Sequence, residues 1–124
     1  MPYVTITATQ RLTPQQKKQL LQGSSDAVVE SLQAPLSSVR VVLHELPEGH
    51  YLNAGQFDTA AIQYEVDLIE GRSEEAKAAL IKHLSKVAHD ATGISEEEVR
   101  TRMTDFPTTD IGMANGITAK QAGR

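Results

Sequence analysis

The sequence predicts an α+β fold in which two tandem β-α-β units form a four-stranded sheet with two helices on one face. Segments with the two-residue hydrophobic period of a strand alternate with segments of helical period, and the order strand, helix, strand occurs twice. The chain also matches itself when it is shifted by 60 residues without a gap. The matched pairs include Lys17 with Lys77, Leu20 with Leu80, Ser25 with Ser85, and Arg40 with Arg100. This internal duplication predicts one domain over residues 1–124, with a first unit at 2–61 and a second at 62–121.

Composition excludes several classes of protein. Hydrophobic residues make up 40% of the 124 residues and charged residues 23%, as in ordinary globular domains. The net charge is −4 and no run is rich in lysine or arginine, so we expect no nucleic-acid partner. The absence of cysteine excludes disulfides and thiolate chemistry, and none of the four histidines has the spacing of metal ligands. No signal peptide or membrane-spanning run is apparent, so we expect a cytoplasmic protein without a membrane partner.

The first unit begins with a strand at residues 2–9, where apolar side chains alternate with threonines and predict one buried face. A helix follows, for which Thr13 is the expected N-cap and Gln16 completes a capping box. Ala34-Pro35 ends this helix, because the residue before a proline disfavours helical geometry. Alternation then returns at residues 38–46, which predicts the second strand.

The second unit repeats this order. Residues 61–70 alternate as a strand does, and Ser73 caps a helix that closes at Gly93. Residues 98–106 form the fourth expected strand. The two strands within each unit should be parallel and joined by right-handed crossovers, which places both helices on the same face of the sheet.

The other face of the sheet should be covered by copies of the same chain, since two helices cannot cover both faces. The glycine-bearing turns at 47–57 and 107–117 are expected to form short arms between subunits. Their apolar residues would otherwise be exposed in a single chain; these are Tyr51, Leu52, Ile111 and Met113.

Pro2 has two interpretations. A proline lacks a backbone donor and suits the first residue of a strand, which is a purely structural role. A small second residue also allows Met1 to be removed, which would leave Pro2 as a free secondary amine. The remaining motifs favour the chemical interpretation.

Four features together resemble the 4-oxalocrotonate tautomerase family. They are Pro2, the Glu-Gly-Arg-Ser turn at 70–73, the run 34–41 that leads into a strand, and the run 48–55 that follows it. The resemblance covers nearly the whole chain, and the double length is similar to fused members of this superfamily. It implies the tautomerase (MIF-like) fold and a homotrimer, which would cover the open sheet face.

The resemblance also implies roles for individual residues. Pro2 would be the general base, and Arg72 would bind a carboxylate of a small enol or oxo acid. Arg40 or Arg100 would hold the second carboxylate or the oxo group, and Tyr51 would form an aromatic wall. No cofactor and no metal are implied. Burial and neighbouring arginines both disfavour an ammonium ion, so they should lower the pKa of Pro2 toward the working pH of a base.

The two halves differ at the residues that matter for chemistry. The first half has Arg11-Leu12 where the second half has Gly71-Arg72, so its arginine is displaced by one position. The second half begins with Ile62, which is internal and offers no amine. We therefore expect one competent site per chain, built from Pro2 and Arg72.

The leading hypothesis is an isomerase for an enol-oxo acid such as 2-hydroxymuconate or a phenylpyruvate-like enol. A cis-3-haloacrylate dehalogenase of hydratase type is one alternative, but the water-activating carboxylate would fall at Met113, with Asp110 displaced. A malonate semialdehyde decarboxylase is another, but its acidic residue is replaced here by Ser38. A non-catalytic trimeric binding protein is the alternative from a different class.

Overall fold

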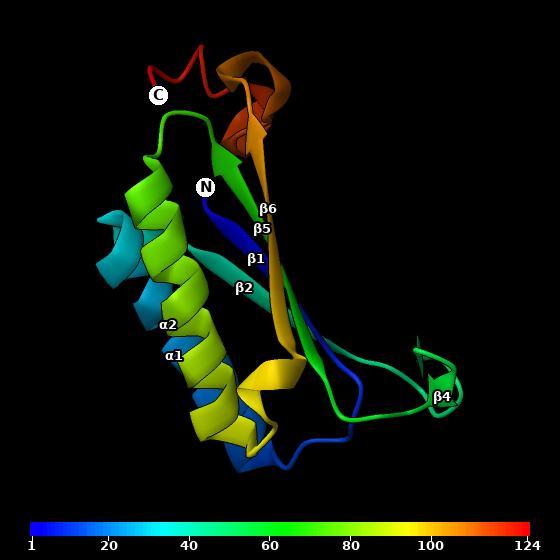
Figure 1. Cartoon of the computed structure of the whole chain (residues 1–124). Helices are drawn as coiled ribbons and strands as arrows, with labels where there is room; N and C mark the ends of the chain where they lie inside the picture. The colour runs from blue at the N-terminus through cyan, green and yellow to red at the C-terminus, as the bar shows by residue number, and fades with distance from the viewer.

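The computed structural model describes residues 1–124 as a four-stranded sheet with two helices against one face (Figure 1). The sheet order is β2-β1-β5-β6. Its strands are β1 (Tyr3–Ala8), β2 (Arg40–Glu45), β5 (Ile62–Ile69) and β6 (Val99–Phe106), and a small second sheet pairs β3 (Leu52–Asn53) with β4 (Gln56–Phe57). The helices are α1 (Pro14–Leu32) and α2 (Glu74–Thr92), with four short 3₁₀ turns, η1 (Leu36–Ser38), η2 (Glu96–Glu98), η3 (Thr108–Asp110) and η4 (Ala114–Gly116). The predicted fold class of two tandem β-α-β units is confirmed.

The direction of the strands decides which residues meet. Pairing is parallel within each unit, between β1 and β2 and between β5 and β6. The units join through β1 and β5, which are antiparallel with Tyr3 opposite Asp67 and Ala8 opposite Ile62. The start of the first unit therefore lies beside the end of β5, where the turn into α2 begins.

Local sequence signals set the limits of both helices. The Thr13 hydroxyl accepts a hydrogen bond from the Gln16 backbone N–H (3.1 Å), and the Gln16 side chain accepts one from the Thr13 N–H (2.9 Å). This is the predicted capping box. Ser73 caps α2 through the Ala76 N–H (3.1 Å), and Gly93 ends it with a φ of 78°.

The core lies between the helices and the inner face of the sheet. The fully buried side chains include Ile6, Leu20, Val28, Ile62, Tyr64, Val66, Leu68, Leu80 and Leu84. Among them, the Tyr64 and Ser24 hydroxyls are hydrogen-bonded at 2.9 Å, so β5 and α1 share one buried polar contact. Burial raises the pKa of Tyr64 to about 12, which keeps its hydroxyl protonated.

The opposite sheet face has no covering layer in a single chain. Tyr3 and Val42 are exposed on it to 38% and 46%. The β3–β4 hairpin projects from one end of the sheet (Figure 1), with Leu52 and Phe57 exposed to 58% and 65%. None of the helices is both long and apolar enough to cross a membrane.

The arm after β6 differs from the expectation in one respect. Ile111 was expected to be exposed in a single chain, but it is buried, with 6% exposure. The segment folds back on itself, because the Ala119 N–H donates to the Ile111 carbonyl (2.9 Å) and Gly112 bridges Thr118. Met113 and Tyr51 are half-buried, whereas Leu52 is exposed as expected.

We expect Tyr64→Phe to lower the free energy of unfolding by about 1–3 kcal/mol, because it leaves the buried Ser24 hydroxyl without this partner. The double variant Ser24→Ala/Tyr64→Phe should recover part of the loss, since both polar groups are then gone. Urea denaturation at one protein concentration measures all four corners of this cycle. Strictly additive effects would contradict a coupled pair.

The same contact has a pH dependence whose sign follows from the raised pKa. Folded Tyr64 keeps its proton to higher pH than the unfolded chain, so its contribution is complete below about pH 10 and is lost as pH rises toward 12. In this window the wild-type melting temperature should fall more steeply than that of Tyr64→Phe. Equal slopes would contradict the assignment.

Candidate active site

Pro2 lies buried immediately before β1. Its carbonyl accepts a hydrogen bond from the Arg40 backbone N–H at 3.2 Å, which fixes the start of the chain against β2. Because β1 and β5 are antiparallel, Pro2 lies at the end of the sheet where β5 ends and the Arg72 turn begins. This end of the strands is called the Pro2 edge below.

Arg72 is delivered to this edge by a turn that requires glycine. Gly71 has a φ of 118°, a conformation that residues with a Cβ rarely adopt. The half-buried Arg72 side chain then donates from Nη1 to the Leu32 carbonyl at 2.6 Å. Leu32 is the last residue of α1, so the guanidinium of one unit satisfies a free carbonyl at the negative end of the other unit's helix. This contact orients Arg72 and leaves its other N–H donors available.

The terminal amine, carried by Met1 in the structure, lies among three arginines. Burial is the largest cause that lowers its pKa, followed by the positive charges of Arg124, Arg40 and Arg72. Two of these arginines were expected from the sequence. Arg124 was not, because a shift of 60 residues places it on Tyr64 inside a strand, so the repeat contains no counterpart.

The Arg40 guanidinium is held by carbonyl groups of the chain just before it. Its guanidinium donates to the Ser37 carbonyl (2.8 Å) and to the Val39 carbonyl (3.2 Å). The side chain is exposed at the start of β2, on the same edge as Pro2. Arg40 and Arg72 therefore belong to two different segments at this edge, the start of β2 and the turn between β5 and α2.

Arg100 and Tyr51 are not brought to Pro2 within one chain. Arg100 lies on β6 opposite Gln63, at the beginning of β5, whereas Pro2 lies at its end. Tyr51 lies in the segment leading into the β3–β4 hairpin, which leaves the sheet at the end away from both termini (Figure 1). A role for either residue at Pro2 would need a second copy of the chain.

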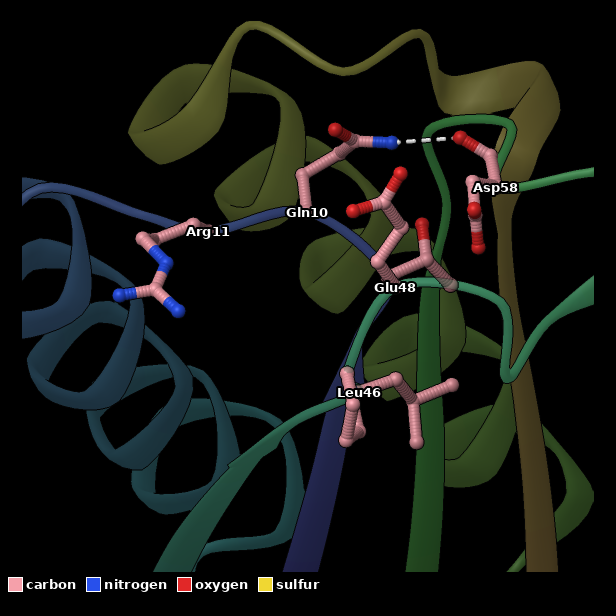
Figure 2. A pocket seen from close by; sticks show the side chains of 7 residues that line it. Gln10, Arg11, Leu46, Glu48 and Asp58 are labelled. Atoms are coloured by element: carbon pink, nitrogen blue, oxygen red, sulfur yellow. Dashed lines mark hydrogen bonds between the residues drawn. The ribbon is translucent and has the colours of Figure 1, made fainter.

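The opposite end of the sheet has a different character. A cavity of about 350 Å³ is lined there by Thr9, Gln10, Arg11, Leu46, Pro47, Glu48 and Asp58. Figure 2 shows Arg11 lying apart from Glu48 and Asp58, on the side of α1, while the Gln10 amide donates to the Asp58 carbonyl (2.8 Å). Ile62, the counterpart of Pro2, is fully buried in β5. The lining of this cavity contains two carboxylates and no amine.

The dehalogenase and decarboxylase alternatives each need an acidic residue, and the positions expected for it hold Met113 and Ser38. Met113 is half-buried in the C-terminal arm, and the exposed Asp110 accepts a hydrogen bond from the Thr109 hydroxyl at 2.8 Å. The Ser38 hydroxyl donates to the Pro35 carbonyl at 2.8 Å. The chain thus presents an amine with arginines at one edge rather than an acid that activates water.

Comparison with known proteins shows the family of the chain. A family model described as "Tautomerase enzyme" matches the chain twice, at residues 2–60 and 65–119. A 2-hydroxymuconate tautomerase from Comamonas testosteroni is 37% identical over 60 residues, which are 48% of this chain and 94% of that protein. The chain is therefore about twice the length of this relative.

Two solved structures match over almost the full length. The structure of Pt0534 inactivated by 2-oxo-3-pentynoate is 61% identical with a TM-score of 0.96, over 98% of this chain and 99% of that one. Q0, a fused 4-OT described as a symmetric trimer, is 42% identical with a TM-score of 0.95, over 99% of this chain and 100% of that one. From the two matched copies, the fold and these relatives, the chain belongs to the tautomerase family and is a fused, isomerase-type member of it.

Proposed function

We propose that this isomerase moves a proton within a 2-hydroxymuconate-like enol acid, with the amine of Pro2 as the base once Met1 is removed. The observation that supports this most directly is the terminal amine set among three arginines beside buried Pro2. The neutral nitrogen accepts the enol hydroxyl proton, and the resulting ammonium returns it to a carbon of the conjugated acid. The substrate and product have the same atoms, so no co-reactant is needed.

The surroundings of the amine suit this task. A base must be neutral to accept a proton, and both burial and nearby cations make the ammonium form less stable. The same arginines are attracted to a substrate carboxylate, to which a guanidinium can donate two parallel hydrogen bonds. A bound dianion would offset part of their charge, which stabilises the ammonium that forms during the reaction.

We also propose that the chain works as a homotrimer. The uncovered sheet face and the exposed Leu52 and Phe57 of the hairpin provide apolar surface for contact with other copies. The fused relative Q0 is described as a symmetric trimer. In such an assembly a neighbouring chain would supply Tyr51 and, as the alternative to the chain's own Arg40, its Arg100 to the Pro2 site.

We expect Pro2→Ala, purified without Met1, to lower kcat/KM for 2-hydroxymuconate by about 10²–10⁴-fold, the usual contribution of a general base. Pro14→Ala is the matched control, since Pro14 lies at the start of α1 at the opposite end of the sheet. Intact mass verifies Met1 removal, and circular dichroism verifies the fold. Unchanged turnover in the Pro2 variant would remove Pro2 from the mechanism.

Retention of Met1 offers a second test of the same base. It converts the Pro2 nitrogen into an amide, which does not accept a proton, so the uncleaved protein should be inactive. Equal activity of cleaved and uncleaved protein would contradict the role of Pro2.

We expect Arg72→Ala to lower kcat/KM for a dicarboxylate enol by roughly tenfold to a hundredfold, because one charge-assisted contact of ~1.5–3 kcal/mol is lost. Arg11→Ala is the control and should have little effect, since Arg11 lies at the other end of the sheet. Arg72 also bonds Leu32, so melting temperatures are measured for both variants, and Arg72→Lys keeps the charge without the planar fork. Greater damage from Arg11→Ala would reverse the assignment.

The hairpin predicts the oligomeric state. Leu52→Asp combined with Phe57→Asp should shift the trimer toward monomers, because two charges would be buried at the interface. Ile81→Asp is the control, since Ile81 is similarly apolar and exposed but lies on α2. Light scattering at micromolar concentration decides, and a wild-type monomer would contradict the proposal.

A further inference from the structure

The segment after β6 starts at the same edge as Pro2. Phe106, the last residue of β6, pairs with Ile69, and its carbonyl accepts a hydrogen bond from the Glu70 N–H at 3.0 Å. Glu70 is two residues before Arg72. The C-terminal arm therefore begins next to the turn that delivers the expected substrate-binding arginine.

The arm is folded against itself and returns to this edge. The Lys120 N–H donates to the Thr108 carbonyl (3.0 Å), and the Arg124 N–H donates to the Ala119 carbonyl (2.9 Å). Ala119 is fully buried, which anchors the turn that leads to Arg124. Figure 1 shows both termini at one end of the sheet. The position of Arg124 is thus set by hydrogen bonds and burial.

Unlike Arg40 and Arg72, Arg124 has a guanidinium without a hydrogen-bond partner. Arg72 donates to the Leu32 carbonyl, and Arg40 donates to carbonyls of the loop before β2. The Arg124 side chain makes no hydrogen bond or ion pair within the chain, so all of its N–H donors are available. After burial, the charge of Arg124 is the largest cause that lowers the pKa of the Met1 amine, ahead of Arg40 and Arg72.

The side-chain carboxylates at this edge do not form ion pairs with the arginines. Asp105, near the end of β6, forms an ion pair with Lys77 at 2.5 Å. Asp67 lies on β5 opposite Tyr3, and Glu70 is exposed in the turn. None of the three pairs with an arginine of the site. An anionic ligand would therefore meet guanidinium groups that no side-chain carboxylate already occupies.

We propose that Arg124 is a further substrate-binding residue of the Pro2 site, where it binds the second carboxylate of a dianionic acid and favours dicarboxylates over monocarboxylates. This inference rests on the proposed function, since it assumes that the Pro2 edge is the substrate site. The family match ends at residue 119, so Arg124 lies outside the residues that the family model covers. It is a property of this chain's own C-terminal arm.

The test compares Arg124→Gln with Lys120→Gln, both in the trimeric protein freed of Met1. Lys120 is exposed on the same arm and loses the same charge, but it is not among the cations that act on the amine. Binding of adipate and of hexanoate, a dianion and a monoanion of equal length, is followed by NMR. Arg124→Gln should raise the Kd of adipate about tenfold and that of hexanoate less than about twofold. Lys120→Gln should change neither.

Titration of ¹⁵N-labelled Pro2 provides a readout that a structural role would not change. Loss of the Arg124 charge should raise the pKa of the amine, and loss of Lys120 should leave it in place. Equal behaviour of the two variants, or a wild-type protein that does not discriminate adipate from hexanoate, would overturn the inference.

The two proposals can fail separately, because neither readout requires turnover. Arg124-dependent binding of adipate in a protein that does not convert 2-hydroxymuconate would support the inference and contradict the proposed function. Turnover that depends on Pro2 but not on Arg124 would do the opposite.

Discussion

The antiparallel pairing of β1 with β5 is the contact on which the site depends. It is the junction between the two units in the sheet, and it sets the end of β5 beside the start of β1. The turn that follows β5 therefore brings Arg72 to Pro2, although the two belong to different repeats. A register slip of one residue would turn Ile6 and its neighbours out of the core, so burial of the inner face also fixes the geometry of the site.

Much of the fold could be predicted because its signals are local or repeated. The Thr13 capping box and the alternating strands depend on residues close in sequence, and the 60-residue repeat sets the order of the elements. The C-terminal arm has one local signal, since the side chains of Thr118 and Gln121 each accept a hydrogen bond from the other's backbone N–H. Its longer-range hydrogen bonds join backbone groups regardless of side chain, so neither the burial of Ile111 nor the return of Arg124 could be deduced from a pattern.

The site was predictable only in part for a similar reason. A motif predicted that Arg72 would face the paired unit, and strand direction explains how it does so. Its contact with the Leu32 carbonyl depends on where α1 ends in space, which no motif records. For Arg100 and Tyr51 the sequence predicts a role at Pro2 but does not say which copy of the chain would supply the residue. Their distance from Pro2 within one chain leaves that question to the assembly.

The bond between Arg72 and Leu32 ties the proposed substrate-binding arginine to the fraying of a helix 40 positions earlier in the sequence. Whenever the last turn of α1 opens, the guanidinium loses the acceptor that orients it, so local unfolding and ligand affinity become one linked equilibrium. If Arg72 binds substrate as proposed, Gln33, which closes α1 in a left-handed conformation (φ 56°), would affect that binding without contacting the substrate. Tolerance to mutation in this turn would then depend on the reaction as well as on the fold.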